Sequence, residues 1–348
     1  MASANRSRPP SPAALEVPVY RPFALLALAV TVGVATPIGA LTLFRLYAPA
    51  GPVPAIWPRL HAHLQLFGFA GLLIMGVGHH LLLRFAHRPI CRPAATPWIL
   101  ALAALGLGSR VAAAAGGALA RTLWVASGIA ETLAYACFAV WVTRQVLAIP
   151  RRFTSDWLIA SGAWWFAAAL GAEAVALLRA VATGTDPAAA IPGPGLYAMG
   201  LYGGVFGWVL GVAMRVAPMF FARRKGMRLG GPVLAVLNAA VLFGVLAERW
   251  SPVERPAQVL LALSDLGAAL ALVIGAVAVG AWEPEPRAVI ALQLDRSEAR
   301  FFRLAFASAG LAAAGLLGGT ALTLAGVPPH GLLADATRHL LTVGFVVG

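Results

Sequence analysis

The chain has 348 residues, of which 60% are apolar and 11% are charged, and its formal net charge is +13. Soluble domains carry about 25% charged residues, so this composition excludes a soluble globular protein and indicates a polytopic protein of the lipid bilayer. The positive charge lies between apolar stretches, where arginine sets membrane topology, so it does not indicate binding to nucleic acid.

Residues 1–22 are rich in proline and serine and lack the apolar core of a signal peptide, so they predict a disordered cytoplasmic tail. Residues 23–348 predict a single all-α transmembrane domain. About ten segments have the roughly 20 apolar residues that a helical span requires: 23–45, 58–84, 96–116, 120–147, 156–182, 195–222, 230–249, 257–282, 300–325 and 332–348. The last segment stops at Gly348 without a flanking charge, so we expect that the chain is truncated within its last helix.

The basic residues of the loops predict the orientation of the chain. Loops after the second, fourth, sixth and eighth segments are rich in arginine, whereas the alternate loops are poor in it. The positive-inside rule therefore places the N-terminus in the cytoplasm, so the second, sixth and tenth segments begin at the outer side. The residues that carry this bias are Arg84, Arg88, Arg92, Arg144, Arg151, Arg152, Arg223, Arg224, Lys225, Arg228, Arg287, Arg296 and Arg300.

Two histidines occupy the same place in the same short pattern, one in the second segment and one in the tenth. His63 begins HLQLFGF and His339 begins HLLTVGF, so Gly-Phe follows at the fifth and sixth positions in both. An ionisable residue inside an apolar helix is costly and tends to mark function. Because two imidazoles can bind the iron of one haem, the pattern predicts a haem held between the second and tenth helices.

A third copy of the pattern, without histidine, lies in the sixth segment as MGLYGGVFG. Aligning Met199 with His63 also aligns Gly204 with Gly68. The copies are spaced by four segments each, which predicts four-helix units related by a rough threefold axis. Three complete units would give a protein of twelve helices, and the chain ends after the second helix of the third unit.

His61 and Arg338 flank the two histidines. His61 lies about 200° around the helix from His63, so the two side chains cannot face one site. We expect His61 to be a hydrogen-bonding neighbour of the site, a copper ligand or an interfacial residue. Arg338 either pairs with Asp335 one turn earlier or binds a haem propionate, which suits a guanidinium fork.

Further ionisable residues fall within the apolar segments. We expect Glu131 and Glu173 to form ion pairs with intramembrane arginines or to carry protons. The arginines available for such pairs are Arg110 and Arg215. His79 and His80 lie near the predicted cytoplasmic end of the second helix, where no other helix supplies a histidine for a second haem. We therefore expect this pair to contact lipid headgroups or water.

The stretches HAHLQLFGF (His61–Phe69) and RHLLTVGF (Arg338–Phe345) resemble the two signature helices of the NnrS family. Members of that family are twelve-helix membrane proteins that carry haem, and reportedly copper, and are linked to nitric oxide response and tolerance. The resemblance covers the whole chain in helix number and spacing, but only these two helices carry motifs. It implies a haem b bound by His63 or His61 together with His339, in the bacterial inner membrane. One departure is GVGHHLLLRF at the end of the second segment, where family members have an apolar turn with tryptophan.

A more distant similarity is to the catalytic subunit of haem-copper oxidases and nitric oxide reductases. That subunit has twelve helices in a pseudo-threefold arrangement, and histidines matching His63 and His339 hold its low-spin haem. Here the sixth and seventh segments lack the histidines that bind the second metal, and Thr337 stands where helix ten has a further histidine. The sequence therefore does not predict a binuclear centre that reduces oxygen or nitric oxide.

With these resemblances, the sequence favours a haem b membrane protein that takes part in nitric oxide response or tolerance. Its expected partners are the lipid bilayer, nitric oxide or another small diatomic ligand, and a redox partner. Two other hypotheses stay open: a membrane transporter or scaffold without haem, and a degenerate oxidase-like subunit that transfers electrons. Haem content distinguishes the haem b protein and the oxidase-like subunit from the transporter or scaffold without haem. The sequence does not decide whether the protein is an enzyme.

Overall fold

The computed structural model describes residues 19–47, 52–87, 94–189, 193–221, 226–251, 253–282, 296–327 and 331–341. Throughout these ranges the regular elements are helices, and nine of them are long and apolar enough to cross a membrane. The expected all-α polytopic fold is therefore confirmed for this part of the chain. Most of the tail predicted at 1–22, and the end of the tenth segment at 342–348, lie outside the described residues.

The elements follow the order of the predicted segments, and the spans are numbered here in that order. Short π-helical stretches interrupt the first, second and sixth spans. The elements are α1 (Arg21–Val30), π-helical η2 (Thr31–Ala35), α2 (Thr36–Tyr47), α3 (Ile56–His63), π-helical η3 (Leu64–Gly71), α4 (Leu72–Phe85), α5 (Thr96–Ala114), α6 (Ala120–Ala148), α7 (Thr154–Ala182), the short 3-10 turn η4 (Pro187–Ala189), α8 (Pro194–Tyr197), π-helical η5 (Ala198–Phe206), α9 (Gly207–Phe221), α10 (Gly226–Ala247), α11 (Arg255–Val279), α12 (Arg296–Leu324) and α13 (Gly331–His339).

Nine of the predicted segments match spans whose ends differ from the prediction by only a few residues. The second segment, for example, was expected at 58–84, and the span covers Ile56–Phe85. The length of an apolar stretch decides where a span lies, and helix-ending residues such as glycine then set its ends. The last turn of α11 closes on Gly280, whose left-handed φ of 67° is accessible because glycine has no Cβ. Of the tenth segment, the structure describes α13 and the two residues after it.

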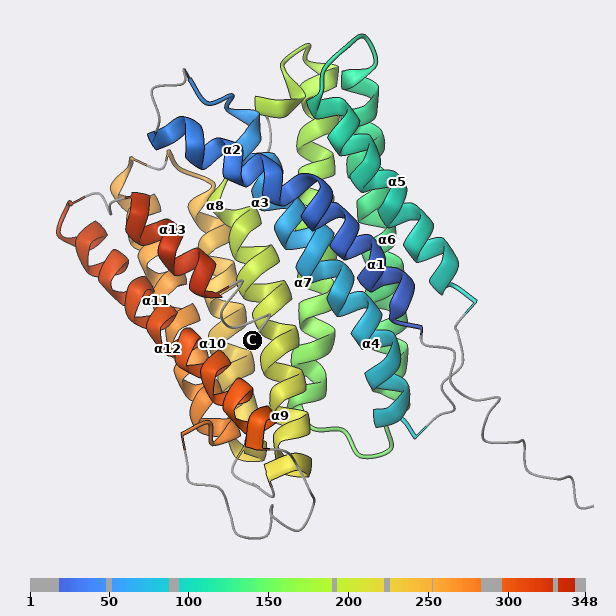
Figure 1. Cartoon of the computed structure of the whole chain (residues 1–348). Helices are drawn as coiled ribbons and strands as arrows, with labels where there is room; N and C mark the ends of the chain where they lie inside the picture. The colour runs from blue at the N-terminus through green and yellow to red at the C-terminus, as the bar shows by residue number, and fades with distance from the viewer. Residues whose placement is uncertain are drawn as a thin grey trace, which may run out of the picture.

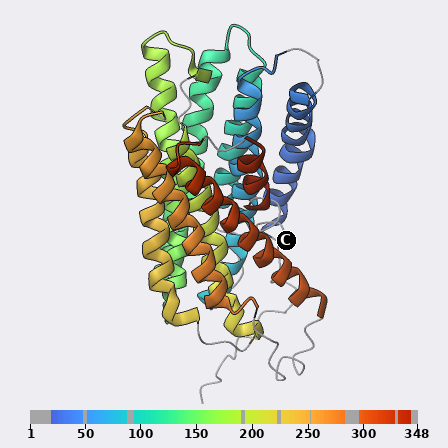
Figure 2. The same cartoon turned by 90° about the vertical axis from the view of Figure 1, so that its left-hand side faces the viewer.

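The helices run side by side as a bundle, with α1 and α2 slanting across α3 and α4 (Figure 1). Neighbours in the chain pack together, α5 along α6, α6 along α7 and α10 along α11. In the view turned by 90°, α12 crosses the bundle obliquely, and α13 packs against it (Figure 2). In spans 2 and 6, 72% and 78% of the residues of the apolar stretch are buried inside the protein, whereas in span 1 only 11% are buried. The helix that carries His63 is therefore an inner helix.

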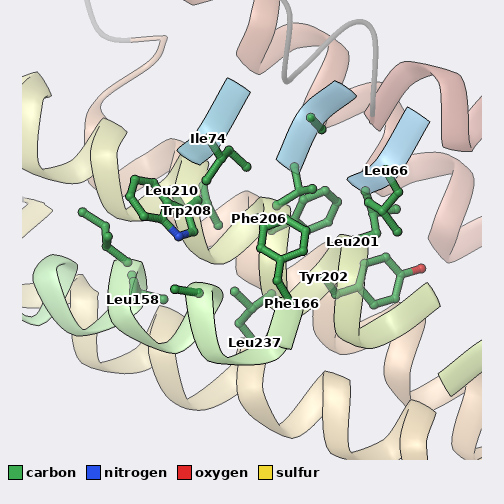
Figure 3. Packing of buried hydrophobic residues seen from close by; sticks show 14 of the residues in the cluster. Leu66, Ile74, Leu158, Phe166, Leu201, Tyr202, Phe206, Trp208, Leu210 and Leu237 are labelled. Atoms are coloured by element: carbon green, nitrogen blue, oxygen red, sulfur yellow. The ribbon is translucent and has the colours of Figure 1, made fainter. Parts of the chain in front are cut away.

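The centre of the bundle is an apolar layer in which span 6 meets spans 2 and 5. Phe206 and Trp208 of span 6 gather there with Phe166 of α7 and Leu66 of η3 (Figure 3). Each of these side chains is at most 8% exposed. On the outside of the bundle, large apolar side chains such as Leu25 are exposed, as contact with lipid tails requires.

π-Helical backbone recurs within two residues of the same place in the three copies of the sequence pattern. The stretch η3 begins directly after His63, and η5 begins one residue before Met199. After His339 the backbone is again π-helical, at residues 340 and 341. Such stretches are rare in helices and are frequent at functional sites. Their recurrence supports the internal repeat, while the threefold relation between the units stays a prediction.

Tyr135 of α6 supports the π-helical turn of span 2 from outside. Its hydroxyl donates a hydrogen bond to the Phe67 carbonyl at 2.6 Å, which gives that carbonyl a partner on another helix. Gly71 leaves room for the hydroxyl, because a Cβ atom at this position would overlap it. The glycine-rich stretch after His63 therefore allows α6 to approach the π-helical turn closely.

Replacing Gly71 with alanine is expected to destabilise the protein by about 1–3 kcal/mol, because the added methyl group must displace the Tyr135 hydroxyl. Thermal unfolding of the detergent-solubilised protein measures the change. Gly108→Ala is the matched control, because a Cβ atom at Gly108 meets no other atom within 4 Å. Equal stability of the two variants would contradict this packing argument.

Candidate functional site

His63 is the last residue of α3, and its side chain points to α6 and α7. Its Nε2 atom lies 2.6 Å from Oε2 of Glu131, and its Nδ1 atom lies 3.3 Å from Oε2 of Glu173. The closer contact is a hydrogen bond, whereas the second is a charge contact without hydrogen-bond alignment. The histidine side chain is only 6% exposed, so all of this takes place inside the protein.

Arg110 of α5 joins the same two carboxylates from another direction. Its Nε atom donates to Oε1 of Glu131 at 2.9 Å, and its Nη1 atom donates to Oε1 of Glu173 at 2.7 Å. Ser127 adds a hydrogen bond to Glu131 at 2.8 Å, and the Trp124 ring lies 5.5 Å from the guanidinium carbon. The ion pairs predicted for Glu131 and Glu173 are thus confirmed, with Arg110 as the arginine. We call His63, Arg110, Glu131 and Glu173 the charge cluster.

The charge cluster draws its four members from four helices, α3, α5, α6 and α7. Its single guanidinium cannot balance two ionised carboxylates, so with both carboxylates ionised the cluster is neutral only when the imidazole of His63 is doubly protonated. That form is also the one that suits the contacts, because ionised carboxylates accept hydrogen bonds but cannot donate them. An unbalanced charge inside a membrane protein is costly, so the geometry favours the imidazolium form.

A glycine on α5 allows α5 and α6 to pack closely at the charge cluster. A Cβ atom at Gly106 would overlap the Cγ atom of Glu131, so α5 and α6 could not pack as closely with a larger residue there. Because Gly106 lies one turn before Arg110, the close approach brings the guanidinium onto the carboxylate. The other arginine considered for the pairs, Arg215, lies 3.7 Å from Asp156 and 4.5 Å from the Phe153 ring.

His61 faces a different neighbour from His63, as the helical offset predicts. Its Nδ1 atom lies 2.8 Å from the carbonyl oxygen of Ala35 in span 1, and its side chain is half-buried. Among the described residues, no group of three or more His, Cys, Asp or Glu side chains is arranged to hold a metal ion. A copper-binding role for His61 stays a prediction.

His339 and Arg338 lie at the end of α13, and both are exposed. The guanidinium carbon of Arg338 lies 5.3 Å from the ring centre of Tyr197, and its charge interacts with Asp265. Asp265 in turn accepts a hydrogen bond from Tyr202 at 2.7 Å. The neighbours of Arg338 thus belong to spans 6 and 8, while the side chain of Asp335, its predicted partner, is outside the described residues.

The arrangement of His63 does not fit ligation of a haem iron as the residues stand. An iron ligand must offer a nitrogen lone pair to the metal, and both ring nitrogens of His63 face carboxylate oxygens. Glu173 near Nδ1 is the kind of partner that a metal-ligating histidine has, but Glu131 occupies the Nε2 side. The predicted pairing of His63 with His339 on one haem stays a prediction that this arrangement does not support.

The expectation for His79 was wrong, because this residue contacts neither lipid headgroups nor water. It is fully buried and stacks on Trp141, with ring centres 4.2 Å apart, and on Phe23, with ring centres 5.4 Å apart. Its Nδ1 atom lies 2.7 Å from the Met75 carbonyl one turn earlier, which suits a neutral ring that donates from Nδ1. The aromatic rings come from spans 1 and 4, so His79 packs the bundle interior.

Sequence reasoning also missed that His63 belongs to the charge cluster. One signal could have revealed it, namely the position of each charge along its own span. Arg110 and Glu173 lie nearer the C-terminal ends of α5 and α7. His63 and Glu131 lie nearer the N-terminal ends of spans 2 and 4. Since successive spans alternate in direction, all four residues fall toward the same end of the bundle.

Comparison of the chain with protein-family models and with curated proteins gives no match. The fold and the site themselves define a class, a polytopic helical membrane protein with a buried cluster of balanced charges between its inner helices. The function proposed below therefore depends on this geometry and on the resemblance of the two histidine-containing helices.

Replacing Arg110 with methionine is expected to destabilise the protein by about 3–5 kcal/mol, because two buried carboxylates then lose their guanidinium. Chemical unfolding in detergent micelles measures the loss. Arg121→Met is the control, since Arg121 is exposed at the start of α6. A loss no larger than that of the control would show that the cluster does not stabilise the fold.

Proposed function

We propose that the chain is a membrane transporter that carries protons across the bilayer and that its proton-binding centre is the charge cluster. The observation that carries the proposal is the charge balance: one guanidinium and two carboxylates inside the bundle, with an imidazole in contact with both carboxylates. Chains of buried histidine and carboxylate side chains are typical of the proton relays of pumps and transporters. Histidine suits this role because its proton leaves and returns at physiological pH.

The position of the cluster links the proton to the packing of the helices. When His63 gives up its proton, the cluster keeps a net negative charge, and the contacts that join α3 to α6 and α7 weaken. Arg110 continues to hold α5 to α6 and α7 in either state. Release of the proton therefore loosens span 2 against a group of three helices that stays together. Movement of one helix group against another is the usual basis of alternating access.

A second candidate is a haem b protein of the NnrS kind, which would act in nitric oxide response or tolerance in a bacterial inner membrane. The observation that favours it is the shared setting of His63 and His339. Both histidines begin the same sequence pattern, and π-helical backbone follows both directly. This candidate requires His63 to release Glu131, and it retains nitric oxide, a redox partner and copper at His61 as proposals.

A potassium diffusion potential is expected to drive protons into proteoliposomes of the wild type several-fold faster than into those of His63→Gln. Glutamine keeps the size and polarity of the side chain but cannot carry the proton of the cluster. A pH-sensitive dye inside the vesicles reports the flux. His61→Gln is the matched control, because His61 bonds to the Ala35 carbonyl and should leave the flux unchanged. If wild type, His63→Gln and protein-free vesicles behave alike, the transporter proposal fails.

The haem candidate predicts a b-type signal in the reduced-minus-oxidised absorption spectrum of the purified full-length protein. Under this candidate, His63→Ala and His339→Ala each abolish or strongly shift the signal, and His80→Ala leaves it unchanged. A pyridine haemochrome assay measures the haem content. A normal spectrum in both single variants rejects ligation by the pair, and absence of haem after expression with an adequate haem supply rejects the candidate as a whole.

A further inference from the structure

Three buried polar atoms of the charge cluster have no hydrogen-bond partner among the described residues. They are Nδ1 of His63, Nη2 of Arg110 and Oε2 of Glu173. Buried polar atoms in proteins almost always have a partner, either in the protein or in an ordered water molecule. Three exceptions from three different helices within one cluster therefore indicate that a further polar group belongs there.

The covalent shape of the guanidinium places these atoms together. The two carboxylates bound by Nε and Nη1 of Arg110 also contact the two nitrogens of one imidazole, so the four side chains meet in one small region. Nη2 is bonded to the same carbon atom as Nε and Nη1, so it lies close to the Glu173 carboxylate that Nη1 binds. The Nδ1 atom of His63 lies 3.3 Å from Oε2 of that carboxylate.

The three atoms restrict the chemistry of a guest. Nη2 of Arg110 can only donate a hydrogen bond, and the ionised carboxylate of Glu173 can only accept one, so the guest must both accept and donate. Two carboxylates disfavour an anion, and the guanidinium disfavours a cation. The four side chains of the cluster are at most 7% exposed, so the guest must also be small. These conditions describe a water molecule.

We infer that a water molecule is bound in the charge cluster, where it accepts a hydrogen bond from Arg110 and donates one to Glu173 beside Nδ1 of His63. Glu131 needs this water less than Glu173 does, because both of its oxygens already have partners in Arg110, Ser127 and His63. A buried water molecule typically has two to four polar partners, and this cluster supplies that number. The site does not depend on the proposed transport of protons.

Infrared difference spectroscopy of membranes exchanged between ordinary water and H₂¹⁸O tests this inference. The wild type is expected to show an O–H stretching band that shifts with the isotope and comes from an internal water molecule. Glu173→Gln is expected to shift or remove this band, because an amide nitrogen can replace the accepting oxygen. Ser127→Ala is the matched control, because Ser127 bonds only to Oε1 of Glu131 and touches none of the three atoms.

An experimental map that resolves water molecules gives a second test that does not depend on how the variants fold. Density for one water molecule between Arg110 and Glu173 supports the inference. Well-ordered cluster side chains without such density overturn it, and so does an isotope-sensitive band that Glu173→Gln leaves unchanged. Density for a larger guest also overturns it. Failure of the proton-flux experiment leaves both results unaffected, so the two proposals fail separately.

Discussion

The energetic cost of an unbalanced charge inside a membrane protein governs the arrangement around His63. Arg110, Glu131 and Glu173 would each be costly alone in an apolar span, and together they share hydrogen bonds and offset part of one another's charge. This offset requires α5, α6 and α7 to meet at one depth, and the imidazole of His63 then draws α3 to the same point. One electrostatic requirement thus fixes the relative positions of four helices, which nonspecific apolar packing alone would leave free to slide.

The π-helical stretches add a second constraint, which acts on the inner helices. In span 2 the stretch begins immediately after His63, and the Tyr135 hydroxyl supports it from α6 at the Phe67 carbonyl. The helix that contributes Glu131 to the charge cluster therefore also supports the backbone that orients His63. Span 6 carries an overlapping π-helical stretch but has Met199 where span 2 has histidine. Similar backbone thus presents an ionisable group in one repeat copy and an apolar side chain in the other.

The spans could be predicted from sequence because apolar length is a property of each segment alone. The site could be predicted only in part, because contacts depend on depth and rotation across several spans. The pairing of Glu131 and Glu173 with an intramembrane arginine followed from the cost of isolated charges, whereas the choice of Arg110 over Arg215 required the structure. The contact of His63 with those carboxylates did not follow, because it depends on how α3 packs against α6 and α7. The burial of His79 was missed for a related reason, because only the packed bundle reveals the aromatic rings of other spans that stack on its imidazole.

The sharing of charges between α5, α6 and α7 has a consequence for how the protein enters the membrane. An arginine or acidic residue within a span opposes insertion of that span when it arrives alone, by about 2.5–3.5 kcal/mol at the centre of the helix. Arg110 and Glu131 are on consecutive helices joined by a short turn, so the pair can partition into lipid as a hairpin whose charges already compensate each other. Glu173 can then join as α7 follows. Biogenesis of this region therefore favours insertion of these spans as a group, and a ribosome stalled between α5 and α6 would hold a span that lipid tolerates poorly.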